Sequence, residues 1–372
     1  MEIFSTEYLP VISFLTAFIV VLLSIPSIIK VAQMKHLYDE PDHRTSHTHS
    51  TPTLGGIAIF AGVLISMGLW INFADSPELK FVISALVIMF FIGIKDDILI
   101  IAPLTKLGGQ IVAAVIIVVV ADLRITSLHG FYGITDISYF ISAPLSVFII
   151  LVIINGFNLI DGIDGLSSGV GTLTAITFGY WFFISSEIQY SLLAFSLAGG
   201  LAAFFRYNVF SRTKKIFMGD TGSLILGIII SVLAIRFNEI NTVNYLPTHV
   251  HSAPAVTIGI LIVPLFDTIR VMFIRVITGR GLFQADKNHI HHRLLELGFS
   301  HIKATMIILF FNICFIAFVF YFQRLEILRL TLLLILLAMA FSHIPVLIIE
   351  SRKKKLIQNT NTKKSHKKKN FK

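Results

Sequence analysis

Long runs of apolar residues recur from one end of the chain to the other, separated by short polar segments. A helix needs about 20 apolar residues to cross a bilayer, and eleven charge-poor runs of roughly that length are present. The pattern predicts an all-α polytopic membrane protein with about eleven transmembrane helices. The runs lie near residues 9–32, 54–73, 79–95, 105–121, 138–157, 165–184, 190–206, 218–237, 253–277, 303–322 and 327–349.

The composition agrees with this pattern. Of the 372 residues, 55% are hydrophobic and only 14% are charged, and the mean hydropathy is +0.83. A water-soluble domain normally carries nearly twice that charged fraction, about 25%. These values exclude a soluble Rossmann or barrel enzyme, and residues 1–350 are interpreted as a single transmembrane domain.

The formal net charge of +9 is a property of the C-terminal end. Residues 351–372 hold 10 of the 30 Lys and Arg residues and no acidic residue. Because this segment has so little apolar content, it is predicted to be a disordered polybasic tail that lies against anionic lipid. We therefore expect a lipid bilayer as partner, and no nucleic acid.

The remaining Lys and Arg residues orient the chain. With the N-terminus outside, 25 of the 30 Lys and Arg residues fall on the cytoplasmic side, and the positive-inside rule favours this orientation. The C-terminus is then cytoplasmic, which agrees with an odd number of spans. The cytoplasmic side carries four loops, at residues 33–53, 96–106, 207–218 and 278–303.

Carboxylates at membrane depth gather on that same side. Such groups are costly in a bilayer and usually mark a functional site. A random scatter of acids would not sort to one side, so we expect the site to face the cytoplasm. The carboxylates at or near the inner ends of their spans are Asp96, Asp97, Asp161, Asp164, Asp220 and Asp267.

The densest polar stretch surrounds the inner end of the fifth span. Asn155, Asn158, Asp161 and Asp164 recur every three residues, so on a helix they would form one stripe. Amides and carboxylates can bind a base, a sugar or a hard cation. Helix packing through small residues would explain the neighbouring glycines but not two acids in one run.

Two further motifs carry acids. Asp220 follows Gly219 at the start of the eighth span, where free helix N–H groups suit phosphate and the carboxylate can hold Mg²⁺; a simple N-cap is the alternative for this motif alone. Asp96 and Asp97 are adjacent, so on a helix they point about 100° apart. Two different roles are expected, one carboxylate on a metal and the other free to take a proton or steer a phosphate.

The basic groups lie in two loops. His289, His291, His292 and Arg293 suit a diphosphate, and zinc is a less favoured alternative. The first loop contains several histidines and an arginine before the Gly-Gly pair at 55–56, which indicates a close backbone approach. Together the motifs predict a Mg²⁺-dependent phosphate site that transfers a phosphorylated headgroup to or from a lipid.

Four motifs, in this order along the chain, resemble those of the polyprenyl-phosphate N-acetylhexosamine-1-phosphate transferases (glycosyltransferase family 4). They are Asp-Asp at 96–97, NxxNxxDGIDGL at 155–166, FMGDTGS at 217–223 and HIHHR at 289–293. The resemblance implies transfer of a sugar-1-phosphate from a UDP-sugar to undecaprenyl phosphate, with release of UMP. It also implies a catalytic domain in a bacterial cytoplasmic membrane and a possible homodimer.

The HIHHR motif resembles the N-acetylglucosamine branch of this family, so UDP-GlcNAc is the expected donor. The muramoyl-pentapeptide branch, which typically carries three histidines followed by Phe-Glu, is the alternative. The resemblance further implies direct attack of the lipid phosphate on the β-phosphorus of the UDP-sugar, helped by Mg²⁺, for which Mn²⁺ is a possible substitute.

The resemblance also implies roles for individual residues. Asp96 would deprotonate or position the lipid phosphate, Asp220 would be the principal Mg²⁺ ligand, supported by Asp97, and Phe217 would stack on the uracil. The expected catalytic set is Asp96, Asp97, Asp161, Asp164, His291 and His292; the nucleotide and sugar would contact Asn155, Asn158, Asp164, Phe217, His289 and Arg293; Arg44 and His47 would contact substrate from the first loop.

Two functions of other classes compete with this one. A secondary transporter for an anionic solute would also contain buried acids and broken helices, but its site would lie near the midplane. A scaffold that recruits acidic partners through the basic tail would lose its function when residues 351–372 are deleted, whereas an enzyme would stay largely active.

Overall fold

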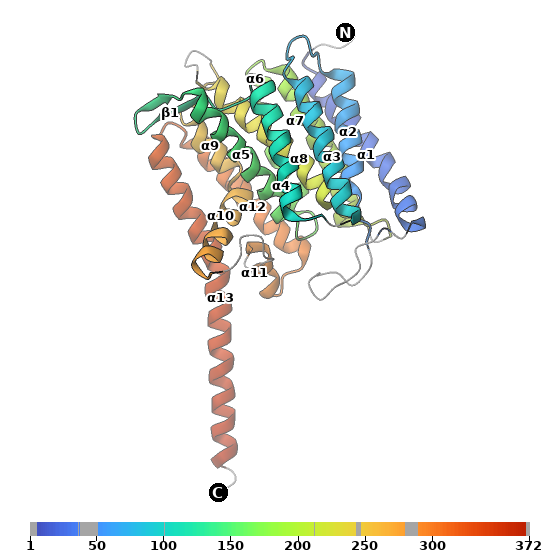
Figure 1. The fold of residues 1–372 in the computed structure, drawn as a ribbon. Coiled ribbons are helices and arrows are strands. Elements are labelled where there is room, and N and C mark those ends of the chain that lie inside the picture. Colours follow the sequence, from blue (N-terminus) through green and yellow to red (C-terminus); the bar gives the residue numbers. More distant parts are fainter. Residues whose placement is uncertain are drawn as a thin grey trace.

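The chain folds into a bundle of helices with one short hairpin (Figure 1). The computed structural model describes residues 6–35, 37, 51–99, 101–211, 213–242, 247–279 and 289–369. Its elements are α1 (Leu9–Met34), α2 (Gly55–Trp70), α3 (Leu79–Leu99), α4 (Pro103–Val115), η1 (Ile116–Val120), β1 (Ser127–Phe131), β2 (Ile134–Asp136), α5 (Tyr139–Ile160), α6 (Leu166–Ile184), α7 (Ile188–Phe205), η2 (Arg206–Phe210), α8 (Gly219–Ile240), α9 (Ala253–Ile260), α10 (Ile262–Ile277), α11 (Ile290–Glu296), α12 (His301–Tyr321) and α13 (Ile327–Lys369).

All eleven predicted apolar runs are helical. Within the described residues, seven helices are long and apolar enough to cross a bilayer, namely α1, α4 with the π-helical turn η1, α5, α7 with η2, α8, α12 and the first part of α13. The protein is therefore a multi-pass membrane protein. The start of α1 and the end of α13 lie at opposite ends of the bundle (Figure 1).

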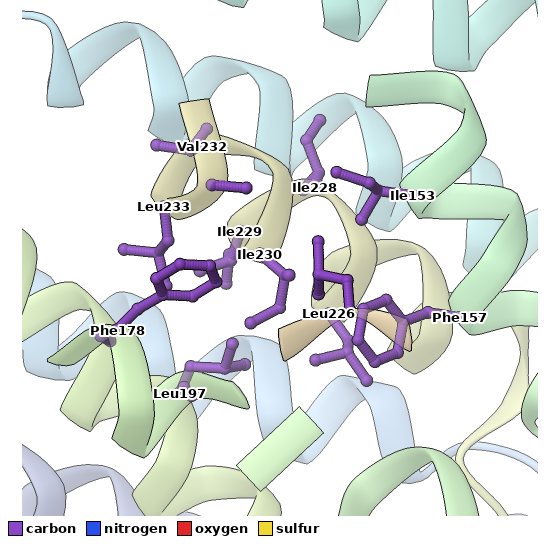
Figure 2. Close-up of a cluster of buried hydrophobic side chains, with 14 of the residues drawn as sticks. Ile153, Phe157, Phe178, Leu197, Leu226, Ile228, Ile229, Ile230, Val232 and Leu233 are labelled. Carbon is purple, nitrogen blue, oxygen red and sulfur yellow. The ribbon is translucent and has the colours of Figure 1, made fainter. Parts of the chain in front are cut away.

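Helix α8 forms the centre of the bundle. Its middle part, from Leu224 to Ile235, is apolar on nearly all sides, as expected of an enclosed helix. Most of α8 is buried, whereas most of α1 is not. Figure 2 shows its leucine and isoleucine side chains packed against Ile153 and Phe157 of α5 and Phe178 of α6. Since α8 is enclosed by its neighbours, its first residues are held in a fixed position.

Three regions differ from the predictions. The ninth run is two helices, α9 and α10, because Pro264 has no N–H to donate to the Ile260 carbonyl and the helix breaks at Leu261.

The all-α prediction also missed the β1–β2 hairpin, an antiparallel pair in the loop between η1 and α5. Its turn contains Gly130 and Gly133 at φ of 81° and 77°, a conformation that suits glycine.

The C-terminal tail is the third difference. It was predicted to be disordered, but α13 continues as a helix to Lys369 and projects from the bundle (Figure 1). A helix already nucleated in the bundle adds residues at little cost, and Lys and Gln are good helix formers, so the missing apolar content does not prevent helix formation. At its base, the guanidinium of Arg352 donates to the Leu297 carbonyl (3.0 Å), which ties α13 to the end of α11.

Asn312 of α12 is a buried polar residue without a polar contact. It is 0% exposed, and neither its amide nitrogen nor its oxygen has a hydrogen-bond partner in the described part of the chain. Because an unsatisfied buried amide is destabilising, Asn312→Leu is expected to raise the free energy of unfolding by about 1 kcal/mol or more. The thermal midpoint in detergent measures this. Cys314→Ala, at an exposed position of the same helix, should leave the midpoint unchanged, and a lower midpoint for Asn312→Leu would contradict the prediction.

Candidate active site

The backbones of α2, α3 and α8 converge at one end of the bundle because glycines line their contact. A side chain at Gly56 would overlap the backbone nitrogen of Gly222, and one at Gly93 would come within 2.7 Å of the Thr221 nitrogen. The segment before α2 also pairs with the segment before α8, since Gly55 N–H donates to the Phe217 carbonyl (2.9 Å). The close approach predicted at Gly55 and Gly56 is confirmed.

Asp97 caps the start of α8. Its Oδ1 accepts a hydrogen bond from the Asp220 N–H (2.6 Å), and its Oδ2 accepts from the N–H (3.1 Å) and the hydroxyl (2.6 Å) of Thr221. Gly219, at φ 69°, makes room for this carboxylate, because a side chain there would come within 2.7 Å of Asp97 Oδ1. The prediction that these N–H groups are free to bind phosphate is therefore wrong. Asp97 holds the backbone of Asp220 in place.

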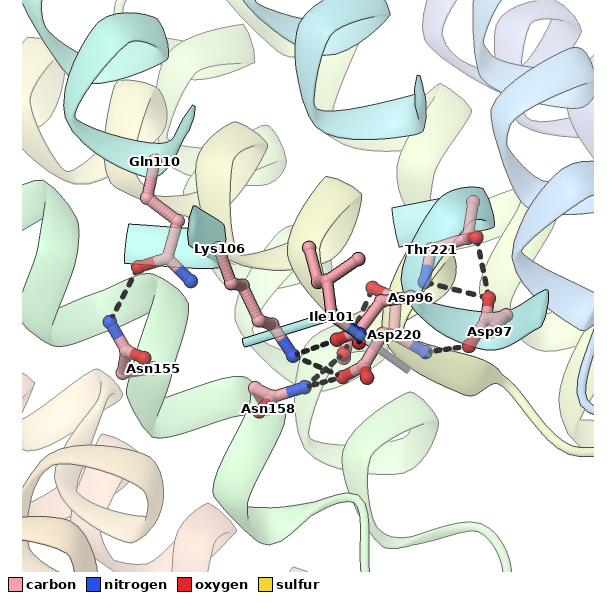
Figure 3. Close-up of polar contacts among 10 residues, drawn as sticks. Asp96, Asp97, Ile101, Lys106, Gln110, Asn155, Asn158, Asp220 and Thr221 are labelled. Atoms are coloured by element: carbon pink, nitrogen blue, oxygen red, sulfur yellow. Dashed lines mark hydrogen bonds and ion pairs between the residues drawn. The ribbon is translucent and has the colours of Figure 1, made fainter. Parts of the chain in front are cut away.

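Asp96 points in a different direction, as predicted for adjacent residues on a helix. Its Oδ1 accepts from the Ile101 N–H (2.8 Å), and its Oδ2 forms an ion pair with Lys106 Nζ (3.0 Å). Lys106 also donates to Asp220 Oδ1 (2.6 Å), so one ammonium group bridges two carboxylates. The amide of Asn158 donates to the same Asp220 oxygen (Figure 3). These four side chains come from α3, α4, α5 and α8 and form one polar cluster.

Asp161 and Asp164 do not continue the stripe begun by the two asparagines. Helix α5 ends at Ile160, and residues 161–165 form a turn that ends at Gly165 with φ 76°. The N–H of Gly165 donates to Asn208 Oδ1 (2.6 Å), which fixes the turn. The prediction of one helical stripe is therefore wrong, because α5 ends at Ile160, before the two acids are reached.

Asn155 also differs from its predicted role. One helical turn before Asn158, its amide nitrogen donates to the buried Gln110 (2.9 Å) and to the Leu151 carbonyl (2.8 Å). Figure 3 shows this pair set apart from the carboxylates. Asn155 therefore joins α5 to α4, and its predicted contact with the nucleotide or sugar finds no support in this placement.

The carboxylate cluster has the chemistry to hold a hard divalent cation. In the described part of the chain, Lys106 is the one ammonium group that forms ion pairs within the set Asp96, Asp97, Asp161 and Asp220. Burial and the neighbouring carboxylates raise the pKa of Asp161 well above its ordinary value, and no described residue donates a hydrogen bond to its side chain. Mg²⁺ is commonly bound by one or two carboxylates and completed by water and phosphate. The described residues hold no group of three or more His, Cys, Asp or Glu that could hold an ion by themselves, so an ion bound here would need water or phosphate oxygens to complete its coordination.

A second cluster surrounds Asp164. Its Oδ2 accepts from Lys215 Nζ (2.7 Å) and lies 3.2 Å from His301 Nδ1. Burial raises the pKa of Asp164, but hydrogen bonds from His301 and Lys215 outweigh it and hold that pKa below its ordinary value. Lys215 lies over the ring of Phe217 at 5.4 Å. The ammonium group of Lys215 thus links the ring of Phe217 to the carboxylate of Asp164.

The HIHHR motif begins helix α11. His289 Nδ1 lies 2.8 Å from Asp267 Oδ2, and its ring stacks on that of His291 at 5.6 Å between centroids. Neither ring nitrogen of His291 has a hydrogen-bond partner in the described chain, and a side chain at Gly162 would come within 2.5 Å of its Nε2. Burial, with the neighbouring His292, lowers the pKa of His291 to about 3. His291 is therefore a neutral imidazole beside the 161–165 turn.

Comparison with known proteins places these residues in a family. The profile of glycosyl transferase family 4 matches residues 79–238, which include three of the four motifs. This segment of the chain is similar to glycosyl transferase family 4. The Salmonella typhi protein named undecaprenyl-phosphate α-N-acetylglucosaminyl 1-phosphate transferase is 28% identical over 287 residues, 75% of this chain and 74% of that protein. A Yersinia pestis protein of the same name is 27% identical over 82% of this chain and 80% of its own length.

A third relative matches over a longer stretch than the Salmonella typhi protein does. The Bacillus subtilis (strain 168) protein named probable undecaprenyl-phosphate N-acetylglucosaminyl 1-phosphate transferase is 28% identical over 305 residues, 80% of each chain. The similarity between this chain and its relatives therefore extends well beyond residues 79–238.

Three residues of the site were not predicted from the sequence. Lys106, Lys215 and His301 each pair with a predicted aspartate. Lys106 carries a usable signal, because it is a lone cation in the apolar segment 103–120. Lys215 and His301 lie in ordinary polar segments and give no such signal. The predicted Arg44 and His47 lie outside the described residues.

Proposed function

We propose that this protein transfers GlcNAc-1-phosphate from UDP-GlcNAc to undecaprenyl phosphate, with release of UMP, at the cytoplasmic face of a bacterial cytoplasmic membrane. One observation carries the proposal. At one end of a membrane bundle, Asp96, Lys106, Asn158 and Asp220 from four helices meet in a single polar cluster. The names of similar proteins indicate undecaprenyl phosphate as the acceptor and N-acetylglucosaminyl 1-phosphate as the transferred group.

The proposed topology has eleven spans, with α9 and α10 together forming the ninth. It places the carboxylate cluster and α11 at the cytoplasmic side and the β1–β2 hairpin outside. The positive-inside count supports this orientation. The location of the site at one end of the bundle, where α8 begins, favours an enzyme over a transporter, whose site would lie near the midplane.

In the proposed reaction, a lipid phosphate oxygen bonds to the β-phosphorus and the bond from that phosphorus to the bridging oxygen breaks, so that UMP leaves. A phosphate monoester is largely ionised at neutral pH, since its second pKa is about 6. The nucleophile therefore needs no general base. Asp96 is already paired with Lys106, and we propose that it orients this ammonium toward the lipid phosphate rather than taking a proton.

Asp220 and Asp161 would hold Mg²⁺, and Asp97 would position Asp220. When bound, the ion would neutralise charge on the diphosphate and on the departing UMP. Phe217 would stack on the uracil, with Asp164 accepting a hydrogen bond from the base. His291, as a neutral imidazole beside the turn, can bond a sugar hydroxyl or acetamide group.

The donor sugar decides the branch. Purified protein in detergent would receive undecaprenyl phosphate, Mg²⁺ and, in separate reactions, UDP-GlcNAc, UDP-GalNAc or UDP-MurNAc-pentapeptide, and UMP release would be measured. Lipid-dependent release with UDP-GlcNAc alone is expected. Release only with the muramoyl-pentapeptide donor would reassign the branch, and release with none of them, from folded protein, would contradict the transferase proposal.

Removal of the tail separates the enzyme from a scaffold. A chain ending at Arg352 keeps the hydrogen bond to the Leu297 carbonyl and loses the projecting part of α13. UMP release per folded molecule is expected to stay within about twofold of wild type, because no site residue is removed. A further cut that also removes Arg352 should lower the thermal midpoint. Loss of turnover in the Arg352 truncation would show that the tail takes part in the reaction.

A further inference from the structure

Asp267 of α10 is a buried carboxylate that the proposed reaction leaves without a role. It is 3% exposed, and its two oxygens bind three donors. Oδ1 accepts from the Arg270 guanidinium (2.7 Å) and from the Ile290 N–H (3.1 Å), and Oδ2 lies 2.8 Å from His289 Nδ1. A carboxylate paired with a guanidinium is ionised and can only accept, so Nδ1 of His289 carries the hydrogen.

These contacts connect α10 to the site. The hydrogen bond from Ile290 fixes the first residue of α11, and the bond from Nδ1 fixes the plane and the tautomer of the His289 ring. His289 is itself 3% exposed and lies nearly parallel to His291, with an interplanar angle of 13°. His291 in turn contacts Gly162, in the turn that carries Asp161 and Asp164. One carboxylate thus sets the orientation of the HIHHR segment against that turn.

We propose that Asp267 is a positioning residue of the transferase, acting through His289. By accepting the Nδ1 hydrogen, it leaves Nε2 as a hydrogen-bond acceptor for a hydroxyl or the acetamide N–H of the donor sugar, and by accepting from the Ile290 N–H it fixes the start of α11 against α10. The inference rests on the proposed function and adds to it a residue outside all four motifs.

The first test is Asp267→Asn, which keeps the size of the side chain but removes its charge and one of its acceptor oxygens. The expected result is a fall in kcat/KM for UDP-GlcNAc on the order of 10- to 100-fold, as for other partners that orient a functional histidine. Thr268→Val is the matched control. Thr268 is the next residue on α10 and is 2% exposed, and its hydroxyl has no hydrogen-bond partner in the described chain, so turnover should be unchanged.

A double-mutant cycle separates positioning from simple destabilisation. If Asp267 acts through His289, adding Asp267→Asn to His289→Ala should lower kcat/KM no further than His289→Ala does alone. Losses that multiply in the double variant would overturn the proposal, as would wild-type turnover in Asp267→Asn. If Asp267→Asn does not fold, Asp267→Glu keeps the charge, displaces it by one methylene and should show the same dependence on His289.

The thermal shift caused by UDP-GlcNAc gives a readout that needs no turnover. The same cycle measured this way should show that Asp267→Asn reduces the shift only when His289 is present. A wild-type protein that is stabilised by UDP-GlcNAc but releases no UMP would contradict the proposed reaction, whereas normal turnover without coupling would contradict only the role of Asp267.

Discussion

Asp220→Asn is expected to lower UMP release by about 10³-fold or more, because electrostatic stabilisation by a bound metal ion is worth several kcal/mol. Asp220 is the carboxylate that the other groups of the cluster converge on. Lys106 and Asn158 donate to its Oδ1, and Asp97 fixes its backbone. Asparagine has nearly the same shape but no charge, so the variant should fold and bind the divalent ion weakly.

The measurement is UMP release as a function of Mg²⁺ concentration. Asp122→Asn is the matched control, because Asp122 is an exposed aspartate that forms an ion pair with Arg124, beyond the far end of α4 and η1 from Lys106. The control should retain wild-type turnover and the wild-type Mg²⁺ dependence. An Asp220→Asn variant with more than about a tenth of wild-type turnover would contradict the assignment, since that loss corresponds to only about 1.4 kcal/mol.

Gly56→Ala is expected to lower the free energy of unfolding by about 3 kcal/mol, at the upper end of the usual cost of overpacking. The added methyl group would overlap the backbone nitrogen of Gly222 and lie 2.7 Å from its Cα. These are backbone atoms, so no side-chain rotation can relieve the overlap, and α2 must move away from α8. That movement would also disturb Asp220, two residues before Gly222.

Gly108→Ala is the control for this substitution. Gly108 lies in α4, close in sequence to Lys106, and a side chain there would meet nothing within 4 Å. Ala is favoured over Gly inside a helix by about 1 kcal/mol, so the thermal midpoint should hold or rise. If Gly56→Ala were as stable and active as Gly108→Ala, the close contact of α2 with α8 would not be required.

The helices are well predicted from the sequence, because each one packs inside the bundle or faces lipid and both environments require an uninterrupted apolar run. The same pattern also predicts that Asp220 opens α8 and that Asp96 and Asp97 diverge, since both follow from helix geometry. The pattern carries no information on whether a helix continues past the last apolar residue. The prediction therefore continued α5 to Asp164, although the helix ends at Ile160, and it missed the extension of α13 to Lys369.

The partners of the site residues were harder to predict, because they come from distant parts of the chain. Asp97 was expected to bind metal or substrate, but its oxygens bind the N–H groups of α8, 123 residues away. The sequence indicates only that Asp267 lies at membrane depth, because nothing in the sequence pairs it with His289. The residue types at the site could be predicted because carboxylates are costly at membrane depth and usually mark a functional site. The tertiary structure was needed to decide which of them bind substrate and which position other groups.

Analysis of the lipid product tests the central proposal most directly. Folded protein would be incubated with undecaprenyl phosphate, UDP-GlcNAc and Mg²⁺, and the extracted lipid examined by mass spectrometry with and without a chelator. The proposal predicts a lipid heavier by one GlcNAc-phosphate unit, formed in equal amount with UMP and absent when the chelator is present. Unchanged undecaprenyl phosphate, or a lipid carrying the sugar without the second phosphate, would contradict it.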